Sequence, residues 1–454
     1  MSSISLDLVL NGGTVVTMDG RRQVLSPGWV SVAEGKIVQV GEGEPPLAAR
    51  TVDHSGDLIL PGFVNTHAHT LGCFTRGMGG DRFSALSPSA LPPTSAIRLE
   101  MGEEEAYAAA RLALLEMQLS GVTTTTDSLT SLRGREHQID GVLRAFAESG
   151  MNAVFYRASV DRTDIFPAQT HDSVDLAATE LDRLRTVWEG PRLGIGLEPL
   201  AMHRVTTNLL QGLIELAADR QVPLALHGPY SKTAAQHSFG RWGRSVVKVM
   251  ADLGGLSPSL LMHHPVVVDA EDIALLAEHG VAVSVCAVGN MLIGVGPAPL
   301  PTLLSAGVRT SLGLDQPNDG HDMFQLMKMT ILAQRGSKGD IWGSPGEMIE
   351  LATQGGAEAL GTQAGSLAPG KWADVVVMDG SHPTLHPRPA ALSNLVLASG
   401  PQAIRSVYVQ GKQAVEAGRH LIWDTDEVTE AVDASFNRCL RRSGLASGRP
   451  DTHG

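Results

Sequence analysis

The chain has 454 residues, of which 43% are hydrophobic and 18% are charged, and because this length exceeds what one hydrophobic core usually holds, we expect one large domain and a smaller one. Its formal net charge of −13 leaves no broad basic surface for a phosphate backbone and argues against nucleic acid as a partner. The longest apolar runs fall well short of the ~20 residues that a membrane helix needs, which argues against a membrane partner.

The cysteines and the first residues of the sequence indicate a compartment. Cys73, Cys286 and Cys439 lie far apart and show no CxxC spacing. The first residues lack the basic and apolar regions of a signal peptide. We therefore expect a cytoplasmic protein.

The two ends of the chain carry the same kind of strand pattern. Residues 6–20 alternate short β-type runs with turns, and residues 404–418 repeat that chemistry. We expect residues 1–60 and 366–425 to form one small, discontinuous β-sandwich domain. Residues 426–454 are expected to form a C-terminal helix and tail.

Eight short β-rich or buried apolar runs lie between these ends, and helical stretches separate them. The runs occupy residues 58–69, 121–128, 152–159, 193–200, 222–228, 260–265, 282–288 and 309–316. Residues 103–121 and 269–280 have apolar positions at i, i+3, i+4 and i+7 and end on glycine, as helices that cover a parallel sheet do. The pattern predicts an α/β fold with a (β/α)8 TIM barrel over residues 61–365, whose chemistry would lie at the carboxyl ends of the strands.

Lone polar residues close several of these runs. His67 and His69 are two residues apart, so their side chains face the same side of an extended strand. His227 and Asp315 each end a later apolar run. Three imidazoles and one carboxylate suit Zn²⁺, with Fe²⁺, Mn²⁺ or Co²⁺ as alternatives, and leave a position for water. We therefore predict one divalent metal ion at the barrel mouth.

Four longer stretches carry a family resemblance. They are LILPGFVNTHAHT (58–70), HHPVVVDAEDIALLAEHGVAVSVCAVGNMLIG (263–294), SLGLDQPNDGHDMF (311–324) and GSLAPGKWADVVVMD (365–379). They resemble the amidohydrolase superfamily, in its branch of cytosine, guanine, adenosylhomocysteine and triazine aminohydrolases, which lies near the phenylurea and thiocarbamate hydrolases. The resemblance implies a metal-bearing (β/α)8 barrel with a β-sandwich built from both termini. It also implies that one catalytic metal is held by His67, His69, His227 and Asp315.

The predicted catalytic groups are Asp315 and one of two adjacent histidines. Asp315 can take a proton from water during attack and pass it to the leaving nitrogen. Because successive strand residues alternate sides, only one of His263 and His264 should face the site. The resemblance favours His263, which would contact the substrate or the metal-bound water. We expect substrate contacts from Tyr230, His264, Asn318, His321, Arg76, Phe74 and Met291.

One position departs from the family pattern. In the related aminohydrolases a glutamate stands three residues after the fifth-strand histidine and protonates a ring nitrogen, whereas this chain has Tyr230. A phenol donates a hydrogen bond but is a poor proton shuttle at neutral pH. We therefore predict a hydrolase that uses metal-activated water to cleave a non-peptide C–N bond in a small neutral or heterocyclic substrate. The bond would be of the amide, urea, carbamate or thiocarbamate type, or would join an amine to a heteroaromatic ring.

Three alternatives remain open. Two of them are enzymes: a deaminase of nucleobases or related heterocycles, and a triazine dechlorinase. The third is an inactive binding or scaffold relative, which a preparation without stoichiometric metal would favour. The sequence has no GxSxG elbow, Walker loop or GxGxxG motif, which argues against a serine hydrolase and a nucleotide-binding enzyme. We expect a homodimer or a larger homo-oligomer.

Overall fold

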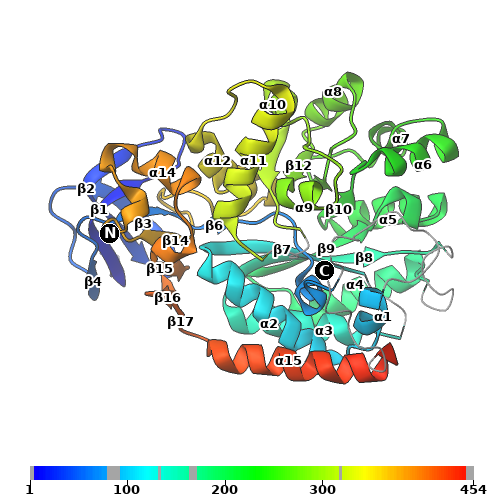
Figure 1. Ribbon diagram of the computed structural model, residues 1–454, viewed down its shortest axis with the longest axis horizontal. Coiled ribbons are helices and arrows are strands. Elements are labelled where there is room, and N and C mark those ends of the chain that lie inside the picture. Colours follow the sequence, from blue (N-terminus) through cyan, green and yellow to red (C-terminus); the bar gives the residue numbers. More distant parts are fainter. Residues whose placement is uncertain (1–4, 79–92, 131–133, 163–170, 316–319, 446–454) are drawn as a thin grey trace, which may run out of the picture.

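The structure, a computed structural model, describes residues 5–78, 93–130, 134–162, 171–315 and 320–445. Two sheets dominate it (Figure 1): a nine-stranded sheet lies at one end of the molecule, and an eight-stranded sheet forms the barrel beside it. The predicted combination of a (β/α)8 barrel and a separate β-domain from both termini is confirmed.

The terminal sheet joins the first and last strands of the chain. Its order is β17-β16-β15-β14-β5-β1-β2-β3, with β4 beside β1. Pairing is antiparallel except where β1 runs parallel to β4 and β5. The strands are β1 (Leu8–Val16), β2 (Val24–Ala33), β3 (Lys36–Glu42), β4 (Arg50–Asp53), β5 (Leu58–Pro61), β14 (Val375–Met378), β15 (Ile404–Val409), β16 (Lys412–Glu416) and β17 (Arg419–His420).

Strand β14 shows how this sheet buries both of its faces. Val375 and Val377 pack with Tyr408 in a cluster that belongs to the terminal sheet. Val376 and Met378 join the large core that extends into the barrel. Because alternate strand residues face opposite sides, a strand between two cores is apolar at every position.

The barrel strands run parallel to one another in chain order, from β6 to β13. They are β6 (Phe63–Val64), β7 (Val122–Thr130), β8 (Asn152–Ser159), β9 (Leu193–Pro199), β10 (Leu224–His227), β11 (Leu260–His263), β12 (Ala282–Val285) and β13 (Arg309–Leu312). The Thr66 amide donates to the Leu312 carbonyl at 3.0 Å, and Ala68 forms a bridge with Asp315. These contacts bring the first and last strands together and close the barrel.

The apolar run at residues 58–69 is divided between the two sheets. Leu58–Pro61 is β5 of the terminal sheet, whereas Phe63–Val64 is the first barrel strand. Gly62 lies at the crossing, where a Cβ atom would stand 2.2 Å from the Thr123 hydroxyl oxygen. A residue with a side chain does not fit there, because β7 passes too close.

Helices cover the barrel sheet and connect its strands (Figure 1). The α-helices are α1 (Pro93–Leu99), α2 (Glu103–Leu119), α3 (His137–Ser149), α4 (Val174–Trp188), α5 (Thr207–Arg220), α6 (Lys232–Trp242), α7 (Val246–Asp252), α8 (Ala270–Glu278), α9 (Ala287–Leu292), α10 (Leu300–Ser305), α11 (Met323–Lys338), α12 (Pro345–Leu351), α13 (Gln354–Leu360), α14 (Ala391–Leu397) and α15 (Thr425–Arg442). Short 3-10 helices are η1 (Thr70–Thr75), η4 (Met202–Arg204), η5 (Pro383–Leu385), η6 (Arg388–Ala390) and η7 (Pro401–Ala403). Within the described part of the chain, every helix is too short or too polar to cross a membrane.

The last helix, α15, lies along the outside of the barrel against α1 and α2 (Figure 1). Its Arg438 donates to the Glu105 carboxylate of α2 at 3.0 Å. Its Phe436 packs against Phe74 of η1, with ring centroids 5.8 Å apart. The C-terminal helix therefore supports the segment that directly follows His67 and His69.

Candidate metal centre

Two histidines follow the first barrel strand in a short extended segment. The Asp315 amide donates to the His67 carbonyl at 2.9 Å, and the His69 amide donates to the Asp315 carbonyl at 3.3 Å. These bonds hold the segment after β6 beside the segment after β13. The imidazoles of His67 and His69 and the carboxylate of Asp315 are thereby brought to one place at the carboxyl ends of the strands, as barrel active sites require.

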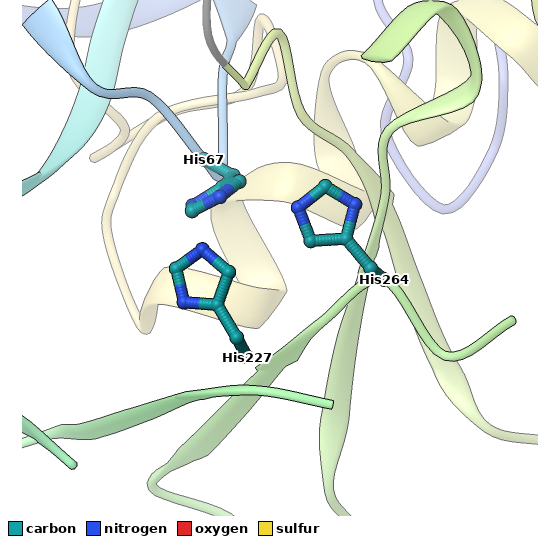
Figure 2. Close-up of side chains that lie close together, drawn as sticks. All are labelled: His67, His227 and His264. Carbon is teal, nitrogen blue, oxygen red and sulfur yellow. The ribbon is translucent and has the colours of Figure 1, made fainter. Parts of the chain in front are cut away.

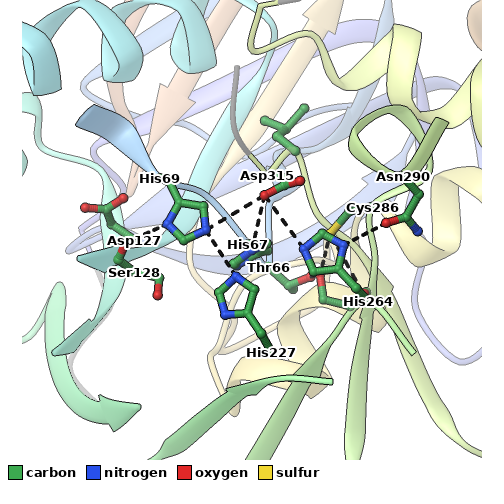
Figure 3. Close-up of polar contacts among 12 residues, drawn as sticks. Thr66, His67, His69, Asp127, Ser128, His227, His264, Cys286, Asn290 and Asp315 are labelled. Carbon is green, nitrogen blue, oxygen red and sulfur yellow. Dashed lines mark hydrogen bonds and ion pairs between the residues drawn. The ribbon is translucent and has the colours of Figure 1, made fainter. Parts of the chain in front are cut away.

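Five side chains converge at this place: His67, His69, His227, His264 and Asp315. Figure 2 shows three of the imidazoles around a common point, and Figure 3 adds His69 and the Asp315 carboxylate. Nitrogens of His67, His227 and His264 lie within 4.8 Å of one another, as do the ligand atoms of His67, His69 and Asp315. Oδ1 of Asp315 is 3.4 Å from Nε2 of His67, 3.7 Å from Nε2 of His264 and 3.8 Å from Nε2 of His69.

Three of the imidazoles are oriented by hydrogen bonds on their far side. Nδ1 of His69 donates to the Ser128 carbonyl at 2.7 Å. Nδ1 of His227 is 2.7 Å from Oε1 of Glu198, and Nδ1 of His264 is 2.9 Å from Oδ1 of Asn290. Because these partners accept hydrogen bonds at Nδ1, each neutral ring presents an Nε2 lone pair toward the centre. Metal-binding histidines are oriented in the same way.

Two of those nitrogens face each other closely. Nε2 of His69 and Nε2 of His227 are 3.2 Å apart. Two imidazole lone pairs repel at that distance unless a proton or a cation lies between them. The pair therefore has the chemistry of a cation site.

His67 is fully buried, and neither of its ring nitrogens has a hydrogen-bond partner in the described part of the chain. Buried polar atoms nearly always have a partner. Burial, followed by repulsion from His69 and His227, lowers the pKa of His67 well below its usual range. The ring is therefore neutral and can donate a lone pair. Together with the other imidazoles and Asp315, it fits a divalent transition-metal ion.

Electrostatics separates His69 from His227. Burial, followed by repulsion from His227, lowers the pKa of His69 to about 4. Burial also opposes the charged form of His227, but the Glu198 carboxylate raises the pKa of His227 overall. A carboxylate behind an imidazole increases the basicity of the nitrogen on the other side, and this strengthens its bond to a metal.

The structure corrects the expected orientation of the two adjacent histidines. Strand β11 ends at His263, and His264 adopts a left-handed φ of 52°, so strict alternation of side chains ends between them. His264 directs Nε2 toward Asp315. His263 instead stacks against His67 at a centroid distance of 3.8 Å, and its buried nitrogens have no partner among the described residues. The histidine that faces Asp315 is therefore His264.

Asp315 occupies a tight position. Its φ of 62° lies in the left-handed region, which residues other than glycine adopt infrequently and often at functional sites. A Cβ atom on Gly289 of α9 would stand 2.3 Å from Oδ2 of Asp315, and one on Gly313 would stand 2.7 Å from Cβ of His67. Both glycines thus allow the backbone to approach the centre.

Two further carboxylates near the centre are already engaged. Burial raises the pKa of Asp127 to about 7. Its carboxylate accepts hydrogen bonds from the amide and the hydroxyl of Thr70 at 2.7 and 3.0 Å. Glu198 accepts from His227 and from the Ser128 hydroxyl. Glu198 was not among the predicted site residues, although it lies near the end of β9 as His227 lies at the end of β10.

Two of the expected substrate contacts belong to one rim network. Arg76 donates twice to the Glu116 carboxylate of α2, at 2.7 Å each, and Nδ1 of His321 is 2.9 Å from the same carboxylate. This network ties the segment after β6 to the segment that precedes α11. Arg76 and His321 thus have a structural partner that the sequence did not indicate.

The remaining expected contacts lie in different surroundings. Phe74 is 3% exposed and packs against α15, so it belongs to the core and does not line an open pocket. Met291 is 43% exposed on α9. The Tyr230 ring lies 6.5 Å from that of His264, at the edge of the centre. Asn318 lies outside the described residues.

Comparisons with known proteins agree with this architecture. The profile of the amidohydrolase family matches residues 58–414. A 5-methylthioadenosine/S-adenosylhomocysteine deaminase from Syntrophobacter fumaroxidans is 32% identical over 444 residues, which cover 95% of this chain and 98% of that protein. A protein of the same name from Bacillus cereus is 30% identical over 440 residues, which cover 94% and 98% of the two chains.

Two solved structures share the fold. One is the zinc complex of atrazine chlorohydrolase TrzN from Arthrobacter aurescens, with a TM-score of 0.85, 24% identity and coverage of 94% of this chain and 100% of that chain. The other is an adenosine deaminase from Xanthomonas campestris with bound zinc, with a TM-score of 0.84, 24% identity and coverage of 96% and 99%.

Proposed function

Because the chain belongs to the amidohydrolase family and is a metal-dependent hydrolase of carbon–nitrogen bonds, we propose that it cleaves the bond between a carbonyl carbon and nitrogen. Amides, ureas, carbamates and thiocarbamates are the substrates of this type. The observation that carries the proposal is Tyr230, which stands three residues after His227 and beside His264.

In this proposal one divalent ion is held by His67, His69, His227 and Asp315. Zinc is supported by the imidazole-rich donor set and by the zinc in the two similar structures. When bound, such an ion lowers the pKa of its water to about 7 and so supplies hydroxide at neutral pH.

The side chains around the ion divide the remaining work. Asp315 accepts the proton of the attacking water and delivers it to the leaving nitrogen. Among the described residues, its carboxylate is the one that points into the group of imidazoles. His264 lies beside Asp315, and its Nδ1 is hydrogen-bonded to Asn290. It orients the carbonyl oxygen of the substrate. Glu198 and Ser128 keep the imidazoles of His227 and His69 in place.

Tyr230 favours a carbonyl substrate for a reason of proton chemistry. Burial raises the pKa of this phenol above its usual value, so it stays protonated at neutral pH. It can donate a hydrogen bond, but it cannot carry a proton to a ring nitrogen and back. A carbonyl carbon is already electrophilic and needs no such transfer. Asp127 and Glu198 do not replace the acid, because their oxygens accept hydrogen bonds from Thr70, His227 and Ser128.

A second candidate is deamination of a methylthioadenosine-type nucleoside. Its support is the 32% identity with a deaminase of that class along nearly the whole length of both proteins. This candidate requires a proton donor other than Tyr230.

A substrate panel separates the two candidates. Phenylurea, an aryl carbamate and an anilide are compared with methylthioadenosine, S-adenosylhomocysteine, cytosine, guanine and a chlorotriazine, each with zinc-loaded protein. We expect amine release from the carbonyl compounds and no ammonia from the nucleosides and bases. Ammonia from methylthioadenosine with inert carbonyl compounds would overturn the proposal. Tyr230→Phe should lower kcat/KM about tenfold through one lost hydrogen bond, whereas Tyr107→Phe, on the surface of α2, should leave it unchanged.

We also place the protein in the cytoplasm, as a homodimer or larger homo-oligomer. All three cysteines are free and buried, which supports a reducing compartment. Sedimentation velocity measures the assembly state.

A further inference from the structure

A second cluster of polar side chains lies beyond Tyr230, outside the metal centre. It surrounds a cavity of about 440 Å³ whose walls include Arg162, His203, His237, Arg241 and Trp242. A cavity of this size accommodates part of a small molecule. No carboxylate is among the described residues that line it.

The cavity opens at the same end of the barrel as the metal centre. Arg162 follows β8, His203 belongs to η4 after β9, and α6 follows β10. Tyr230 connects the two places, because its ring lies 6.5 Å from that of His264 and 6.1 Å from that of His203. The ring of His203 in turn stacks at 6.1 Å on that of His237. The Tyr230 ring therefore stands between the metal centre and the histidine pair at this cavity.

Arg241 is held rigidly in the cavity wall. Its Nη1 donates to the Val205 carbonyl at 2.6 Å and its Nη2 to the Thr207 hydroxyl at 3.3 Å. Its guanidinium also lies 4.3 Å from the ring centroid of Trp242. A guanidinium fixed in this way loses little conformational entropy when it binds an anion.

A second guanidinium, that of Arg162, stands near Arg241 in the cavity wall. Burial, followed by repulsion from Arg162, lowers the pKa of Arg241, so the two guanidinium groups lie close enough to oppose each other. The carboxylate of Asp161 raises the pKa of Arg241 and also accepts hydrogen bonds from the amide and the hydroxyl of Thr206. The two guanidinium groups stand near each other in a chain whose formal net charge is −13. A rigid guanidinium at such a cavity wall attracts an anion.

We propose that the cavity beyond Tyr230 binds the carboxylate of a substrate whose carbonyl group is cleaved at the metal centre. The planar carboxylate matches the fork of a guanidinium, and Arg241 supplies that fork. The inference rests on the proposed function and names its substrate class: amides, ureas or carbamates that carry a carboxylate at the far end, in place of the neutral substrates that the sequence alone indicates.

The residue at position 230 is consistent with this assignment. A glutamate there would place a negative charge between the metal centre and the cavity and would repel an incoming carboxylate. The phenol of Tyr230 is neutral and adds no negative charge on the path to Arg241. The same substitution that removes a proton shuttle therefore admits an anionic substrate.

Two ureas of equal length test the substrate class. N-carbamoyl-6-aminohexanoate carries a carboxylate at its far end, and N-hexylurea lacks it. We expect the zinc-loaded wild type to show at least tenfold higher kcat/KM for the carboxylate compound, mainly through KM. Arg241→Gln should lower kcat/KM for the carboxylate compound to that for N-hexylurea in the same variant, and so remove the preference. Arg241→Lys should restore part of it, because the charge returns without the fork.

Arg244→Gln is the matched control. Arg244 lies two residues after α6, is exposed, and pairs with Asp252 outside the cavity. It should keep the preference of the wild type. Equal kcat/KM for the two ureas, or equal losses in the Arg241→Gln and Arg244→Gln variants, would overturn the inference.

A binding measurement separates failure of this inference from failure of the proposed function. Calorimetry of the zinc-loaded protein with hexanoate, hexanamide and hexyl phosphate needs no turnover. We expect hexanoate to bind at least tenfold more tightly than hexanamide, and Arg241→Gln to abolish the difference. If the Arg241→Gln variant binds hexanoate as tightly as the wild type does, the carboxylate binds the metal instead, and the inference is overturned. Hexyl phosphate bound more than tenfold tighter than hexanoate would overturn the carboxylate assignment. If neither urea is cleaved, the proposed function fails, and calorimetry alone decides the carboxylate site.

Discussion

Two buried polar clusters of this protein differ in how their atoms are satisfied. In the metal centre, His67 is fully buried, and neither of its nitrogens has a hydrogen-bond partner among the described residues. At the joint between the barrel and the terminal sheet, Asp374 is equally buried, but it accepts hydrogen bonds from the Gln410 amide and the Asn152 side chain at 2.8 Å each. Asp374 is complete as it stands, whereas the centre around His67 is arranged for a cation.

The backbone shows the same contrast. His264 and Asp315 both have positive φ values, of 52° and 62°, at the metal centre. Asp374 lies directly before the regular strand β14, and its φ is not positive. Backbone strain at a cluster of ring nitrogens that lack hydrogen bonds indicates a functional site. A relaxed cluster whose polar atoms are all hydrogen-bonded indicates a structural role. Three experiments can break or sharpen this distinction.

The largest effect is expected from removing a proposed metal ligand. His69→Ala or Asp315→Ala should lower turnover by at least about 10³-fold, because the hydroxide source or its proton acceptor is lost. Metal content should fall in His69→Ala, as measured by plasma mass spectrometry, while circular dichroism stays native. Asp374→Asn is the control and should retain both metal and turnover. Full activity in either ligand variant would contradict the assignment of the centre.

A smaller effect is expected from the residue behind a ligand. Glu198→Gln keeps a hydrogen-bond acceptor for Nδ1 of His227 but removes the negative charge. We expect metal affinity to fall about 10- to 100-fold, measured by competition with a chelator. Glu180→Gln breaks an ion pair with Arg183 on α4 and should leave metal affinity unchanged. Equal metal affinity in wild type and Glu198→Gln would mean that the carboxylate only fills space.

The smallest effect concerns pH and the structural cluster. Burial raises the pKa of Asp374 from 3.8 to about 7, so the folded chain holds a proton between these values that the unfolded chain releases. Stability should therefore fall as pH rises from about 4 to about 7, by about 1.4 kcal/mol per pH unit, and level off above 7. The Asp374→Asn variant carries an amide at this position and has no such proton to lose.

The measurement is the free energy of unfolding of wild type and Asp374→Asn, obtained from denaturant titrations across that range. The difference between the two should change with pH in favour of the variant. Parallel curves would show that Asp374 is ionised in the folded protein at all of these values.

The barrel and the terminal β-domain were predictable because their signals are local and repeated. Each barrel run is short and either β-rich or apolar, several are closed by a polar residue, and the helical stretches at 103–121 and 269–280 have an apolar stripe. The division of residues 58–69 between two sheets was not predictable, since Leu58–Pro61 and Phe63–Val64 are equally buried and apolar. Only the partner strands distinguish them.

The positions of the candidate site residues along the barrel strands were predictable, but the orientation of side chains beyond the strand ends was not. His67, His69, His227 and Asp315 are brought together by positions that the sequence indicates. The preference for His263 over His264 rested on the family resemblance, and the geometry differs from it: β11 ends at His263, and His264, with a left-handed φ, directs Nε2 toward Asp315. The pairing of His321 and Arg76 with Glu116 was also beyond reach, since α2 is distant from both in sequence.

The crossing at Gly62 has a consequence for how the protein is made. The histidine segment after β6 is anchored on one side by β5, which pairs with β14 through Pro61 and Val375, and on the other by the Thr66 contact with Leu312. During synthesis the amino-terminal half leaves the ribosome long before either of these later partners exists. The centre therefore assembles only when most of the chain has been translated, so nascent fragments have no complete site with which to capture a metal.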